Sequence, residues 1–249
     1  MKVVRWWASL CVLAVANIAL WSVAAVKGDG QLLQAQLVLS RIYVFGCAFR
    51  SFFPVYDIPR IGVVDSWVSS VLVGRSVATL AEVAFAAQWA VYLHGSPLEG
   101  VRLVSLAIVP LIVVAEVCSW HAVLTTKNLG HVFENSLWGI SAALIVASLV
   151  AIASEYPASR TVLLAVWVIG GLLYVAYIFL TDVPMYWSRW KEDEAQGRQY
   201  LGVAQGIVDV TSRRRVSRLW EDWRSEVTWM TLYFSTGVWT SITLIHAGG

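Results

Sequence analysis

Charged side chains are scarce in this sequence. Only 14% of its 249 residues are Asp, Glu, Lys or Arg, whereas soluble proteins carry about a quarter. The mean hydropathy is +0.67, and apolar runs of about 20 residues, long enough to cross about 30 Å of hydrocarbon, recur along the chain. A soluble domain of this size could not bury so many uninterrupted apolar helices. The composition therefore predicts a polytopic helical membrane protein.

Cysteine, histidine and proline are also few, and each shortage excludes a class of protein. The three cysteines, Cys11, Cys47 and Cys118, lie in apolar segments at unrelated spacings, which excludes a zinc pattern and a disulfide framework. Four histidines are too few for the histidine-box membrane desaturases and hydroxylases. The last apolar run has no lysine, which excludes a retinal protein. Pro110 is the single proline in the middle of an apolar run, which argues against a transporter with discontinuous helices.

The apolar runs predict an all-α bundle of about seven transmembrane helices. The first run follows two positive charges and is longer than the 7–15-residue core of a signal peptide, so an uncleaved span is favoured over a cleaved leader. Residues 1–180 are expected to form a six-span bundle, residues 181–225 a basic loop, and residues 226–249 the last span with a short tail. The predicted spans are residues 6–26, 32–49, 66–93, 101–124, 132–153, 161–180 and 226–245.

The distribution of Lys and Arg predicts the orientation. Eight of them lie in residues 189–224, on the same predicted side as the N-terminus. Positive loops stay in the cytoplasm, so we expect the N-terminus inside, the C-terminus outside, and a bacterial inner (plasma) membrane. The loop interleaves its basic residues with tryptophans and predicts two amphipathic pieces, residues 203–210 and 216–223, with a break at 211–214. They either lie on the anionic inner leaflet or only set the topology; nucleic acid is not an expected partner.

Several ionisable residues interrupt the apolar runs, although each costs about 2.5–3.5 kcal/mol near the membrane centre. At 1.5 Å of rise per residue, Arg41 and Arg75 fall near the middle of the membrane and Glu116 nearer the cytoplasm. Arg75 and Glu82 share a helical face, but their separation of two turns predicts no ideal contact. We expect either arginine to pair with Glu116. Arg41, Arg75 and Glu82 are the predicted substrate-binding residues, with structural ion pairing as the alternative.

A second group gathers at the cytoplasmic ends of the predicted helices. Glu116, His121 and Glu134 are the predicted catalytic residues, and an iron, manganese or zinc site is considered because helical bundles bind such metals through carboxylates and imidazoles. Two observations weaken the metal hypothesis: Glu116 and His121 lie about 140° apart around a helix, and His131-x-x-Glu134 reverses the usual bundle motif. The predicted metal ligands are His121, His131, Glu134 and Glu226.

Three functions remain open at this point. The favoured one is a membrane enzyme that acts on a lipid or another apolar substrate in the cytoplasmic half of the bundle. The second is a small-solute or proton-coupled transporter, because buried Arg and Glu in successive spans are typical of ion paths. The third is a non-catalytic subunit of a membrane complex. Membrane lipids are the expected partners, together with a second copy of the chain or another membrane subunit.

Overall fold

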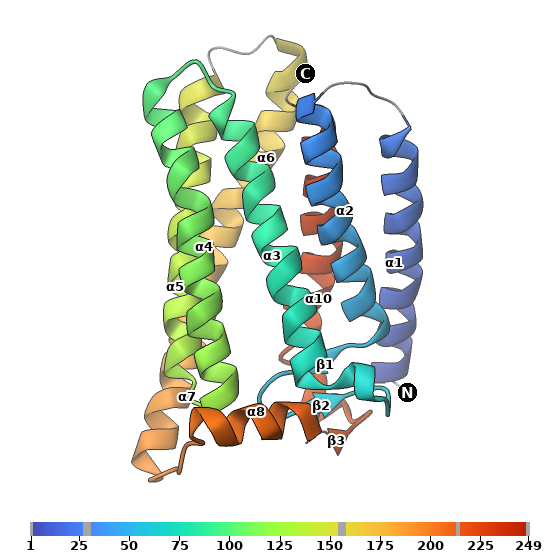
Figure 1. The fold of residues 1–249 in the computed structure, drawn as a ribbon, viewed down its shortest axis with the longest axis vertical. Helices are drawn as coiled ribbons and strands as arrows, with labels where there is room; N and C mark the ends of the chain where they lie inside the picture. Colours follow the sequence, from blue (N-terminus) through green and yellow to red (C-terminus); the bar gives the residue numbers. More distant parts are fainter. Residues whose placement is uncertain (1, 27–30, 154–157, 213–214, 248–249) are drawn as a thin grey trace. The chain divides into compact units, whose positions relative to one another are not determined.

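The computed structural model describes residues 2–26, 31–153, 158–212 and 215–247, and most of these are helical (Figure 1). Within them, five helices are long and apolar enough to cross a membrane, which confirms a polytopic helical membrane protein. All three cysteines are free thiols, and Cys47 is buried whereas Cys11 and Cys118 are partly exposed. The five spans are Lys2–Ala25, Val71–His94, Glu99–Thr125, Leu129–Ile152 and Thr161–Ala195.

The prediction of seven spans is wrong, because two of the predicted segments do not qualify. Residues 32–49 do form a helix, α2 (Gln31–Phe52), but its glutamines, Arg41 and Arg50 make it more polar than the five spans. The last predicted segment is helical throughout, as α10 (Val227–Leu232), the π-helical turn η4 (Tyr233–Gly237) and α11 (Val238–Ala247). Its serines and threonines make it less apolar than the five spans.

The chain forms two compact units. The first contains Met1–Gln88 and Ala204–Gly249, and the second contains Trp89–Val203. Helix α3 (Val71–His94) belongs to the first unit as far as Gln88, and its last turn belongs to the second.

In the first unit, α1 (Lys2–Ala25) and α2 run side by side in opposite directions, and α11 packs on both (Figure 1). The core of this unit is apolar and rich in aromatic residues: the ring of Tyr43 on α2 stacks on that of Phe85 on α3, with centroids 4.5 Å apart. Burying these side chains is the main term that holds the helices together. The buried core residues include Leu10, Tyr43, Val44, Trp223, Met230, Phe234 and Val238.

A small sheet, absent from the sequence-based prediction, closes one end of this unit. Strand β1 (Val55–Tyr56) pairs antiparallel with β2 (Ile61–Gly62), which pairs parallel with β3 (Arg215–Val216). Between β1 and β2, Arg60 is buried at φ +70°. Its guanidinium donates hydrogen bonds to the carbonyl oxygen of Asp57 at 2.7 Å and to the carboxylate of Asp209 at 2.8 Å. The sheet and this ion pair thus attach the long polar segment to the short connection after α2.

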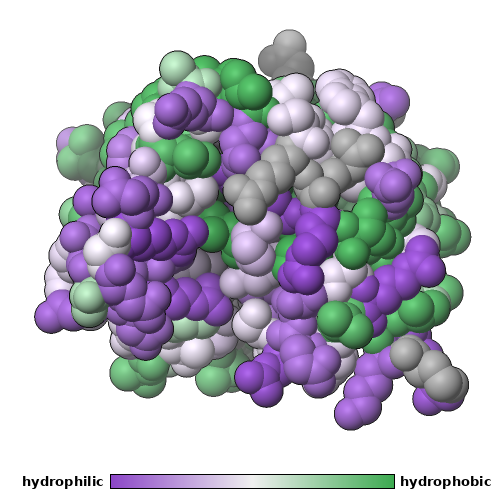
Figure 2. All heavy atoms as spheres, turned by 90° about the horizontal axis from the view of Figure 1, so that it is seen from below, coloured by the Kyte–Doolittle hydropathy of each residue, from purple (hydrophilic) through white to green (hydrophobic). Residues whose placement is uncertain are grey.

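The long polar segment is partly as predicted. Helix α8 (Val203–Ser212) matches the first amphipathic piece and lies across the direction of α1 and α2 (Figure 1). The second piece is strand β3 followed by the single-turn helix α9 (Trp220–Trp223); the predicted break extends to residues 213–214, outside the described residues. Figure 2 shows the molecule from this end, where hydrophilic residues predominate. An end of this kind suits contact with water and lipid headgroups.

In the second unit, α4 (Glu99–Thr125) and α5 (Leu129–Ile152) form an antiparallel hairpin, with α6 (Ala158–Tyr177) packed on α5. Thr126 ends α4 in the left-handed region, at φ 62°. The sixth predicted span does not stop at residue 180. The helix continues through the π-helical turn η3 (Ile178–Asp182) into α7 (Val183–Ala195), which packs back on α5.

Candidate functional site

The close approach of α4 and α5 positions the candidate site. Gly130 stands in the first turn of α5, where an added Cβ would lie 2.6 Å from the carbonyl oxygen of Cys118 and 2.8 Å from the Cβ of Ala122. Glycine is therefore required for the two backbones to approach this closely. His131 follows it, and Glu134 lies one turn further along α5. Both are thereby held against α4, and both are buried.

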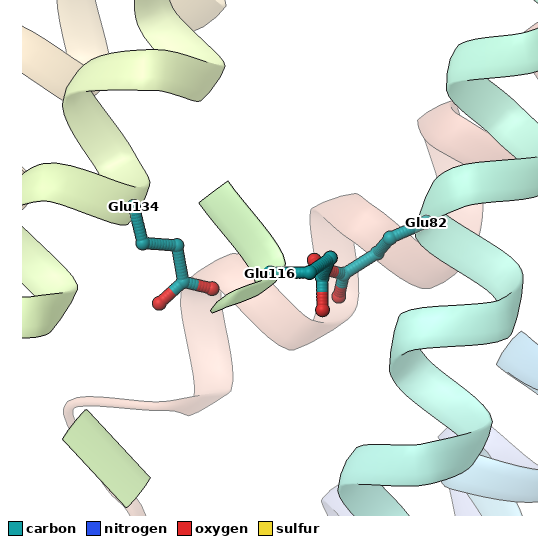
Figure 3. Close-up of side chains that lie close together, drawn as sticks. All are labelled: Glu82, Glu116 and Glu134. Carbon is teal, nitrogen blue, oxygen red and sulfur yellow. The ribbon is translucent and has the colours of Figure 1, made fainter. Parts of the chain in front are cut away.

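Buried carboxylates are the main chemical feature of the long helices. Figure 3 shows Glu82, Glu116 and Glu134, which belong to α3, α4 and α5. Glu116 and Glu134 belong to the second unit, and their carboxylate oxygens lie within 4.8 Å of one another. Two carboxylates this close in an apolar interior repel each other strongly when both are ionised. The pair is therefore suited to hold a proton or a cation.

An imidazole is hydrogen-bonded to one of these carboxylates. The Nδ1 atom of His131 lies 2.6 Å from the Oε2 atom of Glu134. The side chains are 9% and 10% exposed, so water competes little for this contact. A carboxylate that accepts from one ring nitrogen fixes the tautomer and orientation of the imidazole. The other ring nitrogen, Nε2, is then the atom that can accept a proton or bind a metal.

Helix α7 covers the imidazole. The ring of Tyr186 packs on His131 with centroids 4.9 Å apart. The position of Tyr186 depends on η3, the turn that precedes α7. Phe179 of this turn packs so closely on Gly139 of α5 that a Cβ at Gly139 would lie 2.7 Å from its ring. The π-helical turn therefore lies directly on α5, and α7 leaves it along the same helix. Such turns inside α-helices are frequent at functional sites.

Polar contacts attach α7 and the following residues to the end of the hairpin. The side chain of Asn128 donates a hydrogen bond to Asp193 at 2.9 Å, and the backbone N–H of Leu201 donates to the carbonyl oxygen of Thr125 at 3.0 Å. The ammonium group of Lys127 lies 3.6 Å from the carboxylate of Glu194. These contacts hold the polar segment over the turn that carries His131.

Several predicted site residues lie elsewhere. His121 is exposed, so it does not join the buried group. Glu226 belongs to the first unit, where it accepts hydrogen bonds from Ser225 at 2.9 Å and from the indole of Trp229 at 2.7 Å. Arg41 is exposed on α2. The roles predicted for these three residues remain predictions.

Arg75 and Glu82 correct another expectation. They were predicted to be too far apart for a good contact, yet their side chains meet at 3.2 Å within the first unit, and both are buried. Seven residues separate them by about 10 Å along the helix axis, and two long side chains on one face can close this gap. The prediction was wrong because it considered the helix rise and neglected the reach of the side chains.

The sequence-based prediction missed Gly130, Tyr186 and Asp193. Gly130 directly precedes His131, so a glycine at the start of an apolar helix was the available signal for close packing. The positions of Tyr186 and Asp193 could not be inferred, because the continuation of α6 through a π-helical turn has no sequence signature in this chain. Both residues were instead placed in a loop.

Comparison of the chain with protein-family models, with curated proteins and with solved structures found no significant match. Carboxylate oxygens and an imidazole nitrogen are donors that a divalent cation can use. The same groups can also transfer protons.

Proposed function

We propose that this protein is a polytopic membrane enzyme that acts on a lipid or another apolar substrate at the α4–α5 hairpin. One observation carries the proposal: a buried imidazole, held by a carboxylate at 2.6 Å, lies on a hairpin that also buries a second carboxylate. A helix in an apolar setting tolerates such groups at a cost, and functional residues are the usual reason. The substrate would arrive through the bilayer.

In this proposal the three side chains have different roles. His131 is the general base, which takes a proton from substrate or water through Nε2. Glu134 orients the ring and stabilises its positive charge after the proton is taken. Glu116 supplies a second carboxylate within 4.8 Å of Glu134 and either donates a proton to the leaving group or binds a metal.

A metal-bound form of the site follows from the same donors. Glu116, Glu134 and His131 offer oxygen and nitrogen ligands, which suit iron, manganese or zinc. A divalent cation would offset the repulsion between the two carboxylates, and it would lower the pKa of a bound water. Elemental analysis of the purified protein tests this form: about one transition metal per chain in the wild type and much less in Glu134→Gln are expected. Absence of a stoichiometric metal from the wild type would leave only the metal-free form.

We also propose that residues 189–224 face the cytoplasm of a bacterial inner membrane. The support is the concentration of Lys and Arg in residues 189–224 and the tendency of such segments to stay inside. A cysteine placed at exposed Arg218 would then react with a membrane-impermeant maleimide in inside-out vesicles. Reaction in right-side-out vesicles would contradict the orientation.

The enzymatic proposal is tested in vesicles made from the total lipid of the host membrane, with the products measured by mass spectrometry. The wild type should convert one lipid class, and His131→Gln should lower the rate by about 10²- to 10⁴-fold, the usual contribution of a general base. His121→Gln is the matched control, because His121 is exposed on the same hairpin, and it should keep the wild-type rate. The proposal fails if His131→Gln remains active, or if the folded wild type changes no lipid.

A further inference from the structure

Helix α2 carries an arginine on its outer surface at mid-length. Arg41 is exposed, and its guanidinium lies 6.0 Å from the ring centre of Phe45. It stands about 15 Å from the start of the helix and about 16 Å from its end. Helix α2 does not qualify as a span by itself, but it packs along α1, which does. A bilayer crossed by α1 would therefore surround α2 and place Arg41 near the middle of the hydrocarbon layer. Within the described residues, no carboxylate forms an ion pair with it.

The residues around Arg41 form a regular stripe along α2. Gln34, Val38, Arg41 and Phe45 follow one another at intervals of four, three and four residues, and all four are exposed. This is the heptad spacing with which one helix packs along another. The stripe is too polar for lipid: a charged side chain near the membrane centre costs several kcal/mol when it has no partner. The exposed face of α2 therefore has the residue spacing with which helices pack on one another. It also carries a positive charge that needs a negatively charged partner in the membrane.

The structure indicates what kind of partner compensates Arg41. Lipid headgroups can pair with arginines near helix ends, because these side chains extend to the membrane interface. Arg41 is about 15 Å from either end of α2 and is too far from the interface for this. A second copy of the chain would place Arg41 against Arg41. The acids near the middle of its described apolar helices, Glu82, Glu116 and Glu134, are buried, and exposed Glu99 lies at the very start of α4, so none of them can face Arg41 at mid-length. We propose that the α2 stripe binds a transmembrane helix of a different protein, which places an Asp or Glu opposite Arg41.

The first test uses a synthetic apolar transmembrane helix with one central Glu and the same helix with a central Gln. Each peptide carries a fluorescent acceptor, and energy transfer from donor-labelled full-length protein is measured in vesicles. The Glu peptide should bind the wild type roughly 3- to 20-fold more tightly than the Gln peptide, the range for interhelical polar contacts. Arg41→Gln should abolish the difference, whereas Arg102→Gln, an exposed arginine in the first turn of α4, should retain it. Equal binding of both peptides to the wild type would overturn the proposal.

The second test finds the natural occupant. A photoreactive amino acid replaces Val38 in the full chain expressed in its own membrane, and mass spectrometry identifies the crosslinked segment. The expected product joins Val38 to a transmembrane segment that contains Asp or Glu, and Arg41→Gln should reduce its yield. Reversing both charges, with Arg41→Glu and the partner's acid changed to Arg, should restore it. Crosslinks to α2 of a second copy, or to lipid alone, would refute a heterologous carboxylate partner.

Discussion

The contact at Gly130 gives a prediction with a calculable size. In Gly130→Ala the new methyl carbon would lie 2.6 Å from the carbonyl oxygen of Cys118 and 2.8 Å from the Cβ of Ala122. The carbonyl belongs to the α4 backbone and cannot rotate away, so α5 must shift outward. Overpacking of this kind costs about 1–3 kcal/mol. For a chain of this length, 1 kcal/mol corresponds to roughly 2–4 °C in the melting temperature, so we expect a decrease of roughly 2–12 °C.

The control uses the same substitution at a glycine with open surroundings. Gly170 on α6 has no neighbouring atom within 4 Å of an added Cβ, and alanine is favoured over glycine in a helix by about 0.5–1 kcal/mol. Gly170→Ala should therefore keep the wild-type melting temperature or raise it slightly. The assay is the loss of helical circular dichroism on heating the detergent-solubilised protein. If Gly130→Ala melts at or above the wild-type temperature, the close approach of α4 and α5 is not a packing constraint, and the positions argued for the site lose their basis.

Two further predictions concern the sheet end of the first unit. Asp209→Asn removes the carboxylate partner of buried Arg60 and should destabilise the protein by about 3–5 kcal/mol, measured by chemical unfolding in detergent; a loss below about 1 kcal/mol would show that Arg60 does not depend on this pair. The hydroxyl of Ser217 and the guanidinium of Arg215 lower the pKa of Asp222 below its ordinary 3.8. Asp222 therefore stabilises the fold above pH 3.8, and this contribution disappears as the pH falls through the lower folded pKa. The wild type should lose stability over that interval relative to Asp222→Asn, and identical acid profiles would contradict the assignment.

The apolar spans could be predicted because their signal is local. A run of about 20 apolar residues is enough to define a transmembrane helix without knowledge of its neighbours. For the same reason, the hairpin with Glu116, His131 and Glu134 could be located from sequence. Helical phase places His121 about 140° around the helix from Glu116, which argued against one shared metal, but His121 was still predicted as a site residue and its exposure was not foreseen.

The features that could not be predicted depend on three-dimensional contacts. The π-helical turn at residues 178–182 lies within an apolar run that looks like an ordinary helix end, so the return of α7 to His131 was not foreseen. The sheet has two residues in each strand, which is too short for a periodic pattern. Helix α2 was counted as a span because it is helical and long enough, although its glutamines and Arg41 give its outer face a different character.

Two of the buried acids are paired with a basic side chain of their own helix, and Glu116 differs from them in this respect. Arg75 pairs with Glu82 along α3, and His131 pairs with Glu134 along α5, so each of these helices carries its own compensation. Such pairing lowers the cost of inserting each helix into the membrane before the helices associate. Helix α4 offers Glu116 no equivalent, because exposed His121 is the one basic side chain within seven residues of it. The part of α4 near Glu116 thus supplies no lysine or arginine, and a proton or cation bound beside Glu134, whose carboxylate lies within 4.8 Å, would act directly on the charge of Glu116.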